Sequence, residues 1–188
     1  MIALIAGLLL VVGIHALRLF APGLRGRAID RHGATAWRVL HSIVSLAGLT
    51  LLAWGYGQAR EHPVWLWLPA AWSRHAAATL MLPAFVLLAA SLLPGSRIAA
   101  RLRQPLAAAV TLWAFAHLLA NGTLADLLLF GSFLLWAVLA FSVLRQREPP
   151  PPAGTAVRDL QVLAAGMAGW ALFAIGLHGP LIGVRPFF

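Results

Sequence analysis

The chain has 188 residues, of which 61% are hydrophobic and 10% are charged, and it contains no cysteine. A soluble domain of this length would carry about a quarter charged residues, so the composition excludes an ordinary soluble protein, and the lack of cysteine excludes disulfides, thioether-linked haem and iron–sulfur clusters. The net charge of +9 comes from 14 basic residues that are all arginine, with no arginine-rich soluble domain or aromatic-interleaved patch, so we expect no nucleic-acid partner.

Long apolar segments recur along the chain and predict an all-α, polytopic bundle of six transmembrane helices. Bilayer hydrocarbon requires such spans to be helical, because every backbone polar group must be paired internally. The first segment lacks a basic leader and a small-residue cleavage site, so we expect it to be retained. We treat residues 1–188 as a single domain, with spans at about 2–20, 37–58, 74–93, 105–121, 123–144 and 160–178.

The arginines set the predicted orientation. Three of them fall on one side of the predicted bundle, namely Arg60, Arg74 and Arg185. Because cytoplasmic loops are enriched in basic residues, the other side is expected to be cytoplasmic and both termini to lie outside the cytoplasm. That side carries the remaining eleven: Arg18, Arg25, Arg27, Arg31, Arg38, Arg97, Arg101, Arg103, Arg145, Arg147 and Arg158.

Two connections have unusual compositions. The loop from Glu61 to Trp72 is rich in Trp and Pro, and we expect it to lie in the outer membrane interface; a lid over a pocket is the alternative. The run Pro149 to Pro152 is interpreted as a polyproline-type spacer, with a ligand for a partner domain as the alternative.

Histidines are the main candidates for chemistry. Four lie in or near a predicted span, namely His15, His41, His117 and His178, and His75 lies at the mouth of the third span. Ionisable side chains within a membrane usually face the bundle interior, and neutral imidazole is the usual axial ligand of haem iron. Two histidines on different helices could hold an iron porphyrin, whereas the alternative is an interhelical hydrogen bond.

Two polar residues near His117 have structural interpretations. Asn121 precedes Gly122, so we expect this pair to cap the fourth span and form the tight turn into the fifth. Asp126 falls in the first turn of the fifth span, where a carboxylate is favoured by the helix dipole. A role in substrate binding is the alternative for both.

Several motifs resemble the NnrU family of bacterial membrane proteins: GIHALRL (from Gly13), WRVLHSIVSLAGL (from Trp37), WSRHAAATLMLPAF (from Trp72), WAFAHLLANG (from Trp113), FGSFLLWA (from Phe130) and HGPLIG (from His178). The resemblance implies a multi-pass protein of the bacterial inner membrane, linked with denitrification through nitrite and nitric oxide reduction. The family is also similar to plant 15-cis-zeta-carotene isomerase, an integral membrane enzyme that uses haem b.

The resemblance to the isomerase implies a site. Its two proposed axial histidines match His15 and His117, and a further histidine matches His75. Two departures stand out: Gln104 precedes Pro105 where the isomerase has His-Pro, and Ala114 replaces a cysteine proposed to act in a ligand switch. Haem binding therefore carries over, but the thiol-dependent step does not.

The expected depth of each histidine in the membrane does not decide which one is the second axial ligand. At about 1.5 Å rise per residue, His15 is expected some 20 Å from the outer side and His117 roughly 18 Å from the inner side. His75 and His178 lie closer to the depth of His117 and are rival partners. We expect His41 and Trp113 to lie next to the axial histidines, whichever two they are.

Three functions follow from this sequence. The first is a haem b protein that handles nitric oxide or isomerises a lipophilic substrate, with membrane lipid and respiratory or denitrification proteins as surroundings. The second is a cofactor-free accessory or assembly protein for such a complex. The third is a transporter, for which inverted repeats and paired broken helices would be expected but are not visible.

Overall fold

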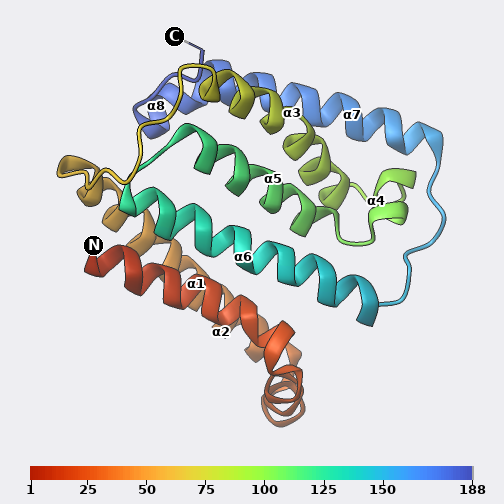
Figure 1. The fold of residues 1–188 in the computed structure, drawn as a ribbon. Coiled ribbons are helices and arrows are strands. Elements are labelled where there is room, and N and C mark those ends of the chain that lie inside the picture. The colour runs from red at the N-terminus through yellow and green to blue at the C-terminus, as the bar shows by residue number, and fades with distance from the viewer. Residues whose placement is uncertain (188) are drawn as a thin grey trace. The chain divides into compact units, whose positions relative to one another are not determined.

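The computed structural model describes residues 1–187, in which the regular secondary structure is helical and no sheet forms, only two isolated β-bridges. The predicted all-α class is confirmed. The elements along the chain are α1 (Ile2–Phe20), α2 (Pro22–Glu61), α3 (Ser73–Leu92), α4 (Arg97–Leu102), α5 (Pro105–Ala120), α6 (Leu124–Arg147), α7 (Ala156–Ala171), the π-helical segment η1 (Leu172–Leu177) and α8 (His178–Ile182) (Figure 1).

Within this described range, 5 helical runs are long and apolar enough to cross a membrane: α1, α2, α3, α6 and the continuous run from α7 through α8. The remaining apolar helix, α5, has 16 residues and is shorter than these. Length and composition thus make the chain a multi-pass membrane protein. Each of the six predicted spans overlaps a helix, and five of them are candidate membrane spans, because α5 falls short of the length that a perpendicular crossing needs.

The second predicted span lies in the part of α2 that follows a kink, and a further helix precedes that kink. Helix α2 begins at Pro22, whose fixed φ suits the first helical position, and continues for 40 residues to Glu61. It is kinked at Gly33, where φ is 85° and ψ is 155°, a conformation that glycine adopts without a steric penalty. The arginine-rich connection before residue 33 is therefore helical rather than extended.

The sixth span also differs from a simple helix. The side chain of Thr155 caps α7 by accepting a hydrogen bond from the amide of Arg158, so the helix starts four residues before the predicted residue 160. Residues Leu172–Leu177 then form a π-helix before α8 begins. Hydrophobic periodicity does not distinguish a π-helical turn from an α-helical one, so the sequence did not indicate it.

The chain divides into two compact units, each described separately. Unit 1 comprises Met1–Trp67 and Thr123–Trp136, and unit 2 comprises Leu68–Gly122 and the chain from Ala137 onward. In unit 1, α1 packs along α2. In unit 2, α3 packs against both α5 and α7, with a small core of Ala89, Ala90 and Val162 (Figure 1).

Candidate functional site: histidines and an apolar cavity

His15 lies near the end of α1 and is half-buried. Its Nδ1 atom is 2.7 Å from the carbonyl oxygen of Val11, one turn earlier. A carbonyl oxygen can only accept, so Nδ1 carries the proton in this hydrogen bond. In the neutral ring the lone pair therefore lies on Nε2, which is the nitrogen available to a metal.

His41 on α2 lies against His15, nearer than Trp136 does. The two ring centroids are 4.8 Å apart, and the ring planes meet at 70°. Trp37, one turn before His41, has its ring centroid 6.3 Å from the His41 ring. The sequence placed His41 near a ligand, and the structure brings it directly against His15.

Glycines bring these two helices together. A Cβ atom added to Gly48 of α2 would lie 2.7 Å from a methyl carbon of Val11, and one added to Gly7 of α1 would lie 2.5 Å from the amide nitrogen of Leu52. A Cβ atom on Gly55 would overlap the backbone of Leu4. Small residues at helix interfaces let membrane helices approach closely, and here they bring His15 and His41 into contact.

Trp136 on α6 completes the surroundings of His15 in unit 1. Its ring centroid is 5.8 Å from that of His15, at an interplanar angle of 84°. Its indole N–H is buried without a hydrogen-bond partner among the described residues, as is the hydroxyl of Ser45, one turn after His41. The indole can only donate, so a group that satisfied it would have to supply an acceptor atom. Sequence reasoning missed Trp136, although it stands in the FGSFLLWA motif.

His117 in unit 2 repeats the arrangement of His15. Its Nδ1 atom is 2.8 Å from the carbonyl oxygen of Trp113, again one turn earlier, so the same reasoning places the lone pair of the neutral ring on Nε2. The Trp113 and His117 ring centroids are 5.3 Å apart. Asn121 is the C-cap residue of α5 and donates from its side-chain amide to the carbonyl oxygen of His117 at 2.8 Å, which confirms its predicted capping role.

The two rival histidines have different surroundings. His75 is exposed in the first turn of α3. His178 begins α8, and its Nδ1 atom lies 2.6 Å from the carbonyl oxygen of Val184. By the same tautomer argument, His178 also directs its lone pair to Nε2. His15 belongs to unit 1, whereas His75, His117 and His178 belong to unit 2, so the identity of the axial pair stays a prediction.

The two positions that depart from the isomerase have clear local roles. The side-chain amide of Gln104 donates to the carboxylate of Glu148 at 2.8 Å, which links the start of α5 to the end of α6 within unit 2. Ala114 is 0% exposed, so its methyl group is packed on all sides. Neither residue offers a metal ligand or a thiol.

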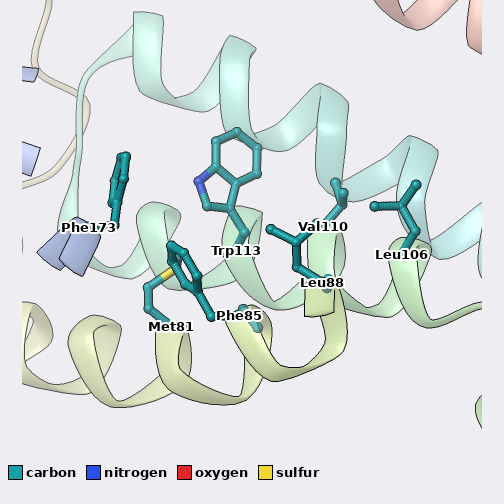
Figure 2. Close-up of a pocket in the computed structure, with 9 residues that line it drawn as sticks. Met81, Phe85, Leu88, Leu106, Val110, Trp113 and Phe173 are labelled. Atoms are coloured by element: carbon teal, nitrogen blue, oxygen red, sulfur yellow. The ribbon is translucent and has the colours of Figure 1, made fainter. Parts of the chain in front are cut away.

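An apolar cavity of about 240 Å³ lies in unit 2 between α3, α5 and η1 (Figure 2). Trp113 and Phe173 both line it, and each also contacts a histidine. The Phe173 and His178 rings meet edge to face, with their centroids 5.7 Å apart. Trp113 is likewise the aromatic neighbour of a histidine, His117. Trp113 and Phe173 therefore each contact both the cavity and a histidine. Its lining comes from three separate segments, so no local sequence pattern could have indicated it.

No group of three or more histidine or acidic side chains in residues 1–187 is arranged to hold a bare metal ion. An iron porphyrin needs only axial ligands, because the macrocycle supplies the other four. The protonated Nδ1 and available Nε2 of His15 and His117 are the chemistry that such axial ligation requires, since the hydrogen bond on one nitrogen directs the metal to the other. Each of these two imidazoles, taken by itself, therefore has the nitrogen chemistry of an axial haem ligand.

Long apolar helices that carry histidines define this chain as a multi-pass helical membrane protein. The family model described as NnrU protein matches residues 3–186, nearly the whole length. The chain belongs to the NnrU family, as its motifs predicted. Neither the curated proteins nor the solved structures contained a match.

Proposed function

We propose that the chain is a six-span protein of the bacterial inner membrane, with both termini outside the cytoplasm, and that it binds haem b through His117 and His15. The observation that carries this proposal is the shared tautomer of the two imidazoles. Their Nδ1 atoms lie 2.7 and 2.8 Å from carbonyl oxygens of the preceding turn. Both rings are thereby oriented, with Nε2 as the coordinating nitrogen. His178 has the same tautomer, so the choice of His15 and His117 as the pair rests on the resemblance to the isomerase.

The bound haem would supply an iron for binding nitric oxide or for Lewis-acid or redox-assisted isomerisation of a double bond in a lipophilic substrate. The chain's own residues would hold and surround it. His41 and Trp136 flank the ring of His15, and Trp113 flanks that of His117. We propose His75 as a further cofactor-binding residue, and His75 and His178 as the rival axial ligands. The family's link with nitrite and nitric oxide metabolism supports a role in denitrification, and its similarity to the carotene isomerase supports isomerase-like chemistry as the alternative.

The test is haem content after haem-replete expression. We expect His15→Ala and His117→Ala each to lower the haem bound per protein at least about tenfold, the effect of losing an axial ligand. His62→Ala is the matched control, because His62 is exposed at the C-cap of α2. His75→Ala and His178→Ala decide between the rival ligands. If His15→Ala and His117→Ala retain haem as the wild type does, the proposed pair is wrong.

A second candidate is a cofactor-free accessory protein for a respiratory or denitrification complex in the membrane. The close approach at Gly7, Gly48 and Gly55 supports it. In this case the stripe of polar and small residues on α2, formed by Arg38, His41, Ser45, Gly48 and Gly55, serves helix packing alone. This function predicts that the histidine variants change stability without any spectral change. It also predicts that the protein co-purifies with a partner complex.

A further inference from the structure

We propose that the cavity of unit 2 is a binding site for a compact apolar molecule about the size of a bicyclic aromatic. Met81, Phe85 and Leu88 of α3 form one wall, Val110 and Trp113 of α5 the other, and Phe173 of η1 closes one end (Figure 2). The lining is apolar apart from the indole N–H of Trp113. A single donor cannot replace the hydration of a charged or strongly polar ligand, so the lining selects an apolar ligand.

Helix irregularities help to shape two walls of this cavity. Pro83 lies inside α3, between the lining residues Met81 and Phe85, and its missing N–H removes one hydrogen bond of the helix. Phe173 lies in the π-helical segment, and π-helical turns occur frequently at functional sites. The Phe85 and Phe173 ring centroids are 5.9 Å apart, so the two irregular segments meet at the cavity. Packing alone would favour regular helices and a filled interior.

The volume limits the size of the ligand. An apolar cavity of about 150 Å³ in another protein holds benzene, and drug-sized ligands occupy pockets from roughly 300 Å³ upward. The value of about 240 Å³ lies between these limits. The cavity, which is open on one side, holds two fused rings or a short branched hydrocarbon, and a whole porphyrin would extend beyond it. Aromatic walls from Phe85, Trp113 and Phe173 favour a planar guest, since aromatic rings attract one another in stacked and edge-to-face geometries.

The aromatic walls connect the cavity to the histidines. Trp113 lines the cavity and lies 5.3 Å from His117 between ring centroids, and Phe173 lines it and lies 5.7 Å from His178. A ligand that shifted either ring would change the surroundings of a histidine. In this respect the inference rests on the proposed function, because the site would receive its lipophilic substrate. Binding is nevertheless measured without reference to haem.

The test uses 1-bromonaphthalene, whose heavy atom quenches tryptophan fluorescence on contact, with the full chain in phosphatidylcholine nanodiscs. The chain has 8 Trp, so the signal of Trp113 is the difference between wild type and Trp113→Phe. We expect this difference to be quenched saturably. Val110→Phe fills the cavity and should weaken the apparent affinity at least about tenfold. Val39→Phe, at an exposed position on α2, is the matched control and should bind as the wild type does.

A second measurement covers the case in which Trp113→Phe is unstable. Naphthalene should raise the thermal unfolding midpoint of the wild type saturably, because a ligand that binds only the folded state stabilises it, and should not raise that of Val110→Phe. Phosphatidylcholine with brominated acyl chains shows whether lipid from the bilayer, and not a separate small molecule, occupies the cavity. Quenching of Trp113 by this lipid alone, or a linear response to 1-bromonaphthalene, would overturn the proposal. Saturable binding by protein that carries no haem after haem-replete expression would leave this site standing and contradict the haem proposal.

Discussion

Asp126 is 4% exposed, yet both of its carboxyl oxygens have hydrogen-bond donors. The hydroxyl of Tyr56 donates to Oδ1 at 2.5 Å, and the amide and hydroxyl of Thr123 donate to Oδ2 at 2.9 and 2.6 Å. The amide of Asp126 in turn donates to the Thr123 hydroxyl, so the two residues form a capping box at the start of α6. Asp126 therefore caps the first turn of α6, as its structural interpretation expected. Its hydrogen bond with Tyr56 also fastens α6 to the end of α2, which the sequence did not predict.

Replacing Tyr56 with Phe tests this connection. A hydrogen bond to a carboxyl group that is then left partly unsatisfied costs roughly 1–3 kcal/mol, so we expect Tyr56→Phe to lower the free energy of unfolding by about that amount. Unfolding of the detergent-solubilised protein by sodium dodecyl sulfate measures it. Ser142→Ala is the control, because its exposed hydroxyl bonds only to the carbonyl of Val138 in its own helix. Equal effects of the two variants would show that the Tyr56 contact adds no stability.

At the scale of elements, the pair α1 and α2 depends on three glycines whose side-chain positions are already occupied by the opposite helix. Gly48 and Gly55 are buried on one face of α2, whereas Gly57 has nothing within 4 Å of its added Cβ atom. We therefore expect substitution by alanine to have opposite effects on stability at these two kinds of glycine. In an exposed helical position alanine is preferred over glycine, and at a contact the extra methyl group must displace the partner helix.

Gly55→Ala and Gly57→Ala form a matched pair on one helix. We expect Gly55→Ala to destabilise the protein by roughly 1–3 kcal/mol, since its Cβ atom would overlap the backbone of Leu4. Gly57→Ala should leave stability unchanged or raise it by up to about 1 kcal/mol. Thermal unfolding in detergent provides the comparison. If Gly55→Ala were as stable as Gly57→Ala, the helices would not pack as closely as described.

The elements also show what the sequence could and could not predict. Hydropathy predicted the ends of α1, α3 and α5 to within one or two residues, because burial in hydrocarbon demands continuous apolar runs. It did not predict α4, which Ser96 initiates by accepting a hydrogen bond from the amide of Ala99. Short polar turns and the π-helical segment depend on local hydrogen bonds and tertiary packing, which leave no periodic pattern.

The candidate site likewise has residues that the sequence predicted and residues that it did not. The histidines stand out in the sequence because ionisable residues are costly in a membrane, so His15, His41 and His117 were identified from their positions in apolar segments. The residues that contact these histidines were not all identified from the sequence. The contacts of Trp136 with His15 and of Tyr56 with Asp126 join residues far apart in the chain, and only the folded unit brings them together.

At the scale of the whole molecule, the distribution of arginine predicts both termini outside the cytoplasm. Because the chain contains no cysteine, single cysteines report on each side without interference. Glu61→Cys, after the second span, should react with a membrane-impermeant maleimide in intact spheroplasts. Ala153→Cys, between the fifth and sixth spans, should react only after the membrane is permeabilised. The opposite pattern of labelling would invert the predicted topology.

The central claim is that this NnrU family protein binds haem b through its membrane histidines. The optical spectrum of the detergent-solubilised protein, purified after haem-replete expression, tests it most directly. We predict a Soret band that shifts on reduction with dithionite and is lost in His117→Ala. A wild-type spectrum with no Soret band, from protein that is folded and fully helical by circular dichroism, would contradict the claim and favour the accessory role.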